Sequence, residues 1–279
     1  MHMSVLSVAL AVAMTTSQIP SENLTNGFAL GCQAWSFNRY TALEAIEKTA
    51  STGAKVIEFF PGQRVSKDFE GSMGQDMSAE AITAIEAQLA KFKIKPAAYG
   101  VTGIDRNEDG ARKLFQWAKR MGIGILNTES TESIDTIEKM VKEFDIKVGF
   151  HNHPRQENNP GYKVWDPAYV LSLVKERDIR IGSCADTGHW VRSGIKPVDA
   201  LRTLKGRIVS SHLKDLDVFA PQGHDVPFGT GVSDMRGILT ELRAQGFKGS
   251  ASIEYEHNWE ASVPDIAQCV GFVRGLPLR

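Results

Sequence analysis

Four short apolar runs in the second half of the chain each end in a side chain of a type that binds metal ions. Each run is too short for a helix and is typical of a buried strand. Amphipathic stretches of helical length separate the runs, so the strands are expected to be parallel and joined by crossover helices. Parallel strands bring four such ends to one point when the sheet closes into a barrel. The four terminal residues are His151, Asp186, His212 and Glu254.

The first half of the chain supplies the other strands that such a barrel needs. From residue 28 onward, strand-like runs alternate with helical periodicity, and helix starts are predicted at Thr41, Ser78 and Asp166. No shift of composition marks a domain boundary. The fold class is therefore expected to be α/β, with one (β/α)8 TIM barrel over residues 28–279. The expected strands cover residues 28–35, 55–60, 95–101, 123–127, 148–153, 181–186, 208–212 and 249–255.

Two long segments rich in polar residues, proline and glycine interrupt this alternation. Residues 154–162 are expected to form an active-site loop, because periodic structure resumes on both sides of them. Residues 213–233 are expected to form a second long loop. After Asp186, the next helix is expected to begin near Pro197.

Residues 1–27 are expected to be an N-terminal extension or a trimmed signal segment. Within them, residues 4–14 form an apolar run of signal-peptide length that is too short to span a bilayer. No Lys or Arg precedes this run, although an export signal normally carries one. If the run is a signal remnant, the protein is exported to the periplasm, and otherwise it is cytoplasmic. The localisation therefore stays open.

Charge and cysteine content exclude several classes of protein. The chain has 279 residues and a formal net charge of −1, so it has no electrostatic footprint for nucleic acid or for an anionic membrane. Three cysteines are too few and too scattered for a disulfide framework or a zinc site built on thiolates. Cys32, Cys184 and Cys269 are interpreted as small buried core residues.

The four strand-end residues predict one divalent metal ion per chain. A mixed set of imidazole and carboxylate donors without thiolate suits Mn, Co, Zn or Mg better than a structural zinc site. A single histidine at a strand end is usually just hydrogen-bonded, but two carboxylates and two imidazoles buried together without a cation are costly. His153 lies two residues beyond His151 and projects to the same face, so either can be the ligand. The register favours His151.

At its motifs the sequence resembles the xylose isomerase-like TIM barrel superfamily of sugar phosphate isomerases and epimerases, and within it a His-Asn-His subgroup. Asp-x-Gly-His, His-Leu-Lys-Asp and a terminal Glu are specific in combination, although each is weak alone. The resemblance extends over most of residues 28–275. The stretches that carry it are Val56–Glu58, Gly149–His153, Cys184–His189, Ser211–Asp215, Gly229–Gly231 and Ser252–Glu256.

The resemblance implies chemistry on a small carbohydrate. Members with a Glu-Asp-His-Glu metal set isomerise or epimerise ketoses, and relatives dehydrate cyclic polyols or cleave 3-keto-glycosides. This chain departs from that set, because His151 stands where the first glutamate is expected. That glutamate often doubles as a base in the epimerases, so the replacement leaves dehydratase, lyase and hydrolase outcomes open.

Proton abstraction next to a sugar carbonyl is the common first step of these reactions. The divalent ion would act as a Lewis acid on the developing enediolate. Glu58, His153 and Glu254 are candidate bases, and Lys214 is a candidate cationic partner for the oxyanion. Trp35, His189 and Glu256 are candidate substrate-binding residues. Without a basic cluster, a free sugar is favoured over a phosphorylated one, although Lys214, Arg64 and Arg192 remain candidates for holding a phosphate.

Two other functional classes are alternatives to the predicted isomerase. An endonuclease acting at abasic DNA sites would need several metal ions and a basic groove, which this composition does not favour. A non-catalytic barrel that binds sugar would not need the complete ligand set, and turnover on a panel of sugars separates it from an enzyme. Oligomeric state is not predicted.

Overall fold

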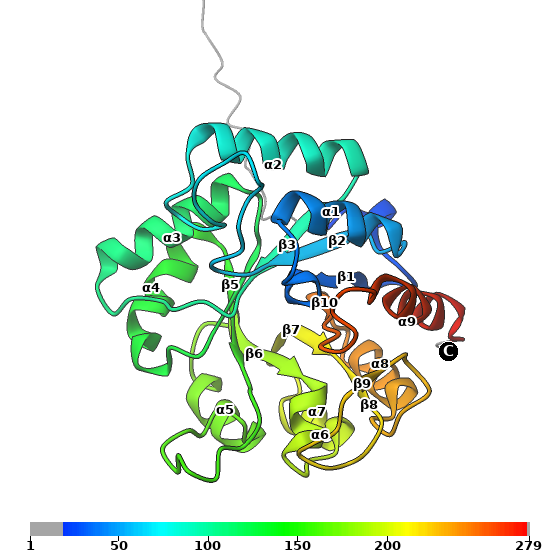
Figure 1. The fold of residues 1–279 in the computed structure, drawn as a ribbon. Helices are drawn as coiled ribbons and strands as arrows, with labels where there is room; N and C mark the ends of the chain where they lie inside the picture. Colours follow the sequence, from blue (N-terminus) through cyan, green and yellow to red (C-terminus); the bar gives the residue numbers. More distant parts are fainter. Residues whose placement is uncertain (1–18, 278–279) are drawn as a thin grey trace, which may run out of the picture.

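The computed structural model describes residues 19–277, and the signal-like run at residues 4–14 lies outside them. Eight parallel strands close into a barrel in the order β1-β10-β7-β6-β5-β4-β3-β2, with helices around the outside (Figure 1). The predicted α/β barrel is confirmed. Its strands are β1 (Ala29–Gln33), β2 (Val56–Phe59), β3 (Lys95–Tyr99), β4 (Ile125–Thr128), β5 (Lys147–His151), β6 (Ile181–Asp186), β7 (Ile208–Leu213) and β10 (Ser250–Ile253).

The outer helices begin where the capping residues predict. Thr41 forms a complete capping box with Glu44, Ser78 caps the next long helix, and Asp166 caps a helix that has proline at its first position. The helices are α1 (Ala42–Ser51), α2 (Ala79–Phe92), α3 (Glu108–Arg120), α4 (Ile134–Phe144), α5 (Pro167–Val174), α6 (Thr187–Arg192), α7 (Pro197–Thr203), α8 (Met235–Ala244) and α9 (Val263–Gly275). Three short 3₁₀ helices are η1 (Ser21–Asn23), η2 (Ala34–Phe37) and η3 (Thr131–Ser133).

The structure corrects the sequence predictions in two places after β6. Helix α6 begins directly after Asp186, whereas the first helix in this region was expected near Pro197. A helix of six residues is too short to show periodicity, but Asp186 caps it by accepting a hydrogen bond from His189 N at 2.7 Å. Residues 213–233 are not purely a loop, because β8 (Asp215–Leu216) and β9 (Asp225–Val226) pair antiparallel within them.

Several strands end earlier than expected, and β5 is one of them, because it ends at His151 and leaves His153 two residues beyond the strand. β1 ends at Gln33 because the chain turns into η2, whose first residues are capped by the Gln33 side chain. β3 ends at Tyr99, and β10 ends at Ile253, so Glu254 lies one residue beyond its strand. Trp35 and Glu254 therefore lie just beyond the carboxyl ends of their strands.

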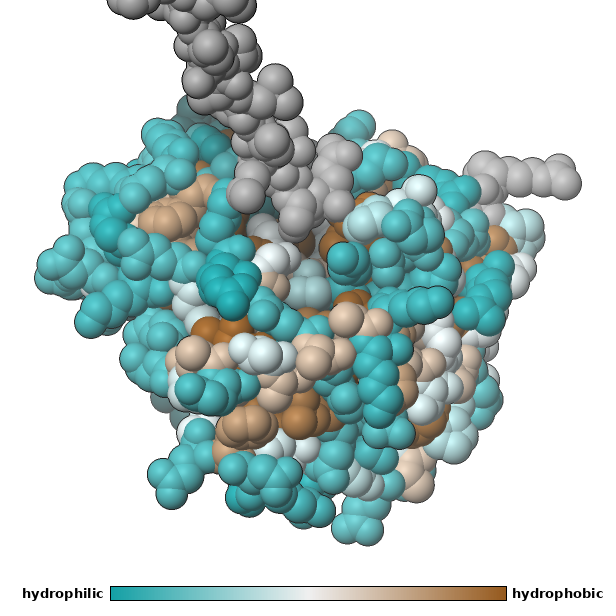
Figure 2. All heavy atoms as spheres, turned by 90° about the horizontal axis from the view of Figure 1, so that it is seen from above, coloured by the Kyte–Doolittle hydropathy of each residue, from teal (hydrophilic) through white to brown (hydrophobic). Residues whose placement is uncertain are grey.

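The core is apolar and continuous between the barrel and its helices. The three cysteines are free and buried, as expected. Figure 2 views the molecule from above and shows mainly hydrophilic residues, with smaller apolar patches between them. Among residues 19–277, no helix has both the length and the apolarity needed to cross a bilayer.

Candidate metal centre

The structure brings the four strand-end residues together. One ligand atom from each of His151, Asp186, His212 and Glu254 lies within 4.8 Å of the others, and all four residues are buried. His151 Nε2 lies 3.5 Å from Asp186 Oδ2, and His212 Nδ1 lies 3.2 Å from Glu254 Oε2. Two donors that each lie about 2.1 Å from one ion at a tetrahedral angle are about 3.4 Å apart. The separations therefore match the edges of a coordination shell.

Several buried polar atoms at the centre of this cluster lack a hydrogen bond. Both ring nitrogens of His151, Oδ2 of Asp186 and Nδ1 of His212 are buried and make no hydrogen bond of good geometry, although Oδ2 of Asp186 also lies 3.1 Å from the ammonium of Lys214. Buried polar atoms are nearly always hydrogen-bonded, so such a group calls for an explanation. A divalent ion is a good one, because imidazole and carboxylate donors suit Mn, Co, Zn and Mg. The residues present fit a divalent metal ion.

Glu58 lies inside the barrel, where it orients His212. Its Oε1 accepts hydrogen bonds from Asn127 Nδ2 at 2.7 Å and from His212 Nε2 at 3.0 Å, and its Oε2 accepts one from Ser252 Oγ at 2.6 Å. A proton on Nε2 of His212 leaves Nδ1 free to face Asp186 and Glu254. The Glu58 carboxylate, expected as a candidate base, thus has its hydrogen bonds within the barrel and no exposed surface.

Asp186 is fixed through both its backbone and its side chain. The Asn152 amide donates to the Asp186 carbonyl at 3.0 Å and accepts from its N–H at 2.9 Å. One carboxylate oxygen caps α6, which leaves Oδ2 toward the histidines. Burial alone would raise the pKa of Asp186, but His189 and Lys214 hold it well below its usual value. The carboxylate is therefore ionised and ready to bind a cation.

Lys214 lies within the cluster with no exposed surface. Its Nζ is 3.1 Å from Asp186 Oδ2, 2.7 Å from Glu254 Oε2 and 2.7 Å from Glu256 Oε2. Burial alone would lower the pKa of Lys214, but these carboxylates raise it well above its usual value, so the ammonium stays charged. His189 is also buried, and its Nε2 is 3.4 Å from the same Nζ.

His153 and Glu129 form a second polar group beside His151. The Glu129 carboxylate lies 2.5 Å from His153 Nδ1 and 3.6 Å from His151 Nδ1. The Tyr162 hydroxyl donates to Glu129 at 2.9 Å and accepts from the His153 N–H at 2.7 Å. Burial alone would raise the pKa of Glu129, but the two neighbouring histidines lower it. His153 remains 46% exposed, so a ligand can reach its ring.

Sequence reasoning missed Glu129, although a signal for it was present. Glu129 directly follows the buried strand β4, as Glu254 follows β10. The sequence predicts that this strand ends at Asn127, two residues before Glu129, so Glu129 does not stand out as a residue at the end of a strand. The pairing of β4 with β5 places Thr128 beside Phe150, and the residues that follow, Glu129 and His153, then come into contact.

The segment that contains β8 and β9 closes one side of the mouth. The Asp215 carboxylate accepts hydrogen bonds from Gly229 N at 2.8 Å, Gly231 N at 3.1 Å and Ser233 N at 3.0 Å. The motif aspartate that follows Lys214 thus holds both ends of this segment together. No site role had been predicted for it.

Arg192 links this segment to the cluster. Its guanidinium lies 3.3 Å from Asp225 Oδ2 and 3.2 Å from Glu256 Oε2, and it donates to the Gly223 carbonyl at 3.1 Å. Burial raises the pKa of Asp225 to about 7. Asp225 was also missed, because it comes from a two-residue strand that leaves no periodic signal.

The candidate aromatic residue Trp35 lies at the rim of the barrel and is 40% exposed. Its ring packs edge-on against Phe60 at 5.0 Å and Trp259 at 6.5 Å between centroids. Ser36, the next residue, accepts a hydrogen bond from Tyr255 N at 2.8 Å. The rim aromatic residue is thereby tied to the segment that carries Glu254 and Glu256.

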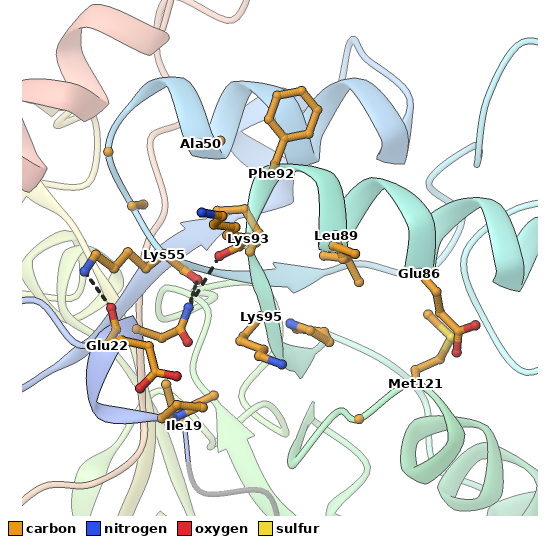
Figure 3. A pocket seen from close by; sticks show the side chains of 18 residues that line it. Ile19, Glu22, Ala50, Lys55, Glu86, Leu89, Phe92, Lys93, Lys95 and Met121 are labelled. Carbon is orange, nitrogen blue, oxygen red and sulfur yellow. Dashed lines mark hydrogen bonds between the residues drawn. The ribbon is translucent and has the colours of Figure 1, made fainter.

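A cavity of about 960 Å³ lies at the opposite end of the barrel from this cluster. It is lined by residues at the amino ends of β2 and β3 and by α2, and Lys55, Lys93 and Lys95 surround it (Figure 3). Lys55 Nζ donates to the Glu22 carbonyl at 2.6 Å. The volume of this cavity is large, but the four candidate ligands all lie at the other end of the strands.

Comparison with known proteins agrees with the geometry. The family model for xylose isomerase-like TIM barrels matches residues 43–271. A solved structure of an uncharacterised protein from Parabacteroides distasonis is 31% identical, with a TM-score of 0.70, and the match covers 88% of this chain and 97% of that one. No curated protein sequence gives a significant match.

Two more distant structures share the fold. A D-psicose 3-epimerase solved in the presence of D-fructose is 16% identical, with a TM-score of 0.66, over 88% of this chain and 99% of that one. A protein from Bacillus anthracis described as a probable 3-DHS dehydratase is 16% identical, with a TM-score of 0.61, over 87% and 97%. The barrel, its strand-end cluster and the family match lead to one conclusion: the chain belongs to the xylose isomerase-like TIM barrel family.

Proposed function

We propose that this chain is a divalent-metal-dependent enzyme that removes a proton from the carbon next to the carbonyl of a sugar or keto-sugar, as an isomerase or epimerase. The observation that carries the proposal is the convergence of four buried ligand atoms, several of them unpartnered, beside a buried ammonium. A divalent ion held there would polarise the carbonyl and the adjacent hydroxyl as a Lewis acid.

His151, Asp186, His212 and Glu254 are the proposed ligands of the ion. His151 is favoured over His153 because its Nε2 is 3.5 Å from Asp186, whereas His153 is paired with Glu129. Glu58 keeps His212 in the tautomer that the site needs. Glu58 therefore acts as a positioning residue in this proposal, not as the base.

His153 is the proposed base. A carboxylate that accepts from Nδ1–H fixes the tautomer and leaves Nε2 free to take a proton. Its ring centroid is 4.6 Å from that of His151 and 5.2 Å from that of His189, so it lies over the cluster. The family resemblance leads one to expect a glutamate base at the end of β5, but His151 stands at that position. The Glu129–His153 pair would supply the missing proton acceptor beside it.

Lys214 is proposed to stabilise the oxyanion that forms as the proton leaves. Its ammonium is buried, charged and adjacent to two of the proposed ligands, and fixed donors in a dry site lower the barrier more than mobile solvent does. His189 and Glu256 lie beside it and are proposed to bind substrate hydroxyl groups. Trp35 is proposed to contact the apolar face of the sugar ring at the rim.

The charges favour a substrate without phosphate. Lys214 and Arg192 are both ion-paired with carboxylates, and Arg64 donates to the carbonyl of Lys67 on an exposed segment. A phosphate would have to displace Glu256 or Asp225 from these partners. The same pairing argues against a DNA backbone as ligand.

Hydrogen exchange with deuterated water tests the proposal. Metal-loaded protein is incubated with free ketoses, cyclic polyol ketones and 3-keto-glycosides, and incorporation of deuterium at carbon is followed by NMR. We expect metal-dependent exchange with at least one class, and the product then separates isomerase from dehydratase and lyase chemistry. A folded, metal-loaded protein that exchanges hydrogen with none of them, or that cleaves abasic DNA specifically, would contradict the proposal.

A further inference from the structure

Lys214 shares two carboxylate oxygens with the proposed metal site. Asp186 Oδ2 faces His151 Nε2 at 3.5 Å and Lys214 Nζ at 3.1 Å. Glu254 Oε2 likewise faces His212 Nδ1 at 3.2 Å and Lys214 Nζ at 2.7 Å. A carboxylate oxygen has two lone pairs, so it can contact an ammonium group and a metal ion at the same time. A fixed positive charge therefore lies within the ligand set itself.

The Asp-Thr-Gly-His motif is shaped to hold this ammonium in place. Thr187 Oγ1 accepts from Lys214 N at 2.9 Å and donates to the Lys214 carbonyl at 3.1 Å, which fixes the backbone. A Cβ atom at Gly188 would lie 2.6 Å from Lys214 Cβ and 2.8 Å from its Cδ. Glycine at this position thus leaves the space through which the lysine stem passes. His189, the last residue of the motif, faces Nζ.

We propose that Lys214 is a built-in counter-cation that sets the affinity of the metal centre. Repulsion between its ammonium and a divalent ion on the same oxygens weakens metal binding and keeps the ion exchangeable. When the ion leaves, the ammonium still neutralises Asp186 and Glu254, which would otherwise be buried and unpaired at high cost. The inference rests on the proposed metal site and adds a determinant of its affinity.

The test replaces Lys214 by methionine, which keeps the unbranched stem of the side chain and removes the charged group. Mn²⁺ affinity is measured by calorimetry, and Tm is measured with metal and with chelator, for the unchanged protein, Lys214→Met and Lys248→Met. Lys248 is exposed near the amino end of β10, so its loss controls for net charge. We expect Lys214→Met to bind Mn²⁺ about tenfold more tightly or better. Its Tm should fall much further than that of the other two proteins when metal is removed.

A second variant covers the case in which Lys214→Met does not fold even with Mn²⁺. Gly188→Ala keeps the charge but displaces the lysine stem, so it should also tighten Mn²⁺ binding, by a smaller factor. If the unchanged protein binds Mn²⁺ and folded variants at both positions bind it no more tightly, the role of Lys214 is refuted. If the unchanged protein binds no divalent ion, the proposed function fails instead. These readouts need no substrate.

Discussion

At the carboxyl ends of the strands, Asp186, His212 and Lys214 have no exposed surface, whereas at the amino ends Lys93 and Lys95 are exposed to solvent. Charged residues lie at both ends of the barrel. The amino end has the cavity of about 960 Å³, and the carboxyl end has the convergent donor atoms. Charged groups are buried only where a partner of opposite sign compensates for lost hydration. The buried, paired charges at the carboxyl end therefore indicate the candidate site better than the volume of the cavity at the amino end does.

The amino end follows the ordinary behaviour of surface lysines. Lys93 and Lys95 are exposed and line the cavity together with apolar residues such as Leu89 (Figure 3). At the carboxyl end, by contrast, the buried charged groups of Asp186, Lys214 and Glu254 are paired with one another. Substitutions at the two ends should therefore differ by orders of magnitude in their effects on metal binding and turnover.

The largest effect is expected for Asp186→Asn. Asparagine is as good a helix cap as aspartate, so α6 should form, but the charged ligand oxygen is lost. Metal content should approach zero, and turnover should fall by about a thousandfold or more. Elemental analysis and the exchange assay measure the two effects, with Asp199→Asn on exposed α7 as the control. A variant that keeps its metal would remove Asp186 from the ligand set.

The next largest effect is expected for His153→Gln, which removes the proposed base and not a ligand. Turnover should fall by about a hundredfold while metal content stays unchanged. Glu129→Gln should lower turnover by a smaller factor, because it removes the partner that orients His153. His224→Gln is a matched control, since His224 is also exposed and paired with an aspartate, at 3.0 Å from Asp217. Loss of metal from His153→Gln would make His153 a ligand instead.

A moderate effect on stability is expected at Asp225. Burial raises the pKa of its carboxyl group to about 7, compared with about 3.9 in an unfolded chain. Between these values the folded state keeps a proton that the unfolded state has lost, so the contribution of Asp225 to stability falls as pH rises from about 4 to about 7. Asp225→Asn lacks this dependence.

Denaturant unfolding at acidic and at alkaline pH checks this prediction. Relative to the unchanged protein, Asp225→Asn should gain about 1–3 kcal/mol in free energy of unfolding between about pH 5 and about pH 8. The exposed Asp217, in the same segment, serves as the control in Asp217→Asn. Parallel pH profiles for all three proteins would show that Asp225 ionises normally.

The smallest effect is expected at the amino end, from Lys93→Gly. Lys93 ends α2 with φ of 56°, in the left-handed region that glycine adopts without steric cost. The free energy of unfolding should rise by up to about 1 kcal/mol, with metal content and turnover unchanged. A change in metal affinity would show that the two ends of the barrel are coupled.

The fold was predictable because it depends on local signals that the sequence carries plainly. Runs ending at Asp186 and His212, together with caps such as Thr41, predict alternating strands and helices without knowledge of which strands pair. The convergence of the four proposed ligands also follows, because parallel barrel strands all present their carboxyl ends at one face.

The contacts around the proposed ligands were less predictable, because they depend on register across the barrel. The sequence makes Glu58 a candidate base, but it does not reveal its partners Asn127, His212 and Ser252, which come from three other strands. Whether a carboxylate faces a substrate or a neighbouring strand is decided by one-residue shifts in pairing. Asp225 depends on a short hairpin with no periodic pattern, and only tertiary structure reveals it.

Three N–H groups donate to the Asp215 carboxylate and so separate the exposed turn between β8 and β9 from the residues around Lys214. Since this carboxylate fastens both ends of the segment and Arg192 holds Gly223, residues 218–222 between β8 and β9 can vary in length or sequence without moving Lys214, the neighbour of Asp215 in the chain. Insertions and substitutions at residues 218–222 would then alter which substrates enter, while the proposed proton-transfer geometry is kept. Related proteins that differ only in this stretch should keep the same reaction on different sugars.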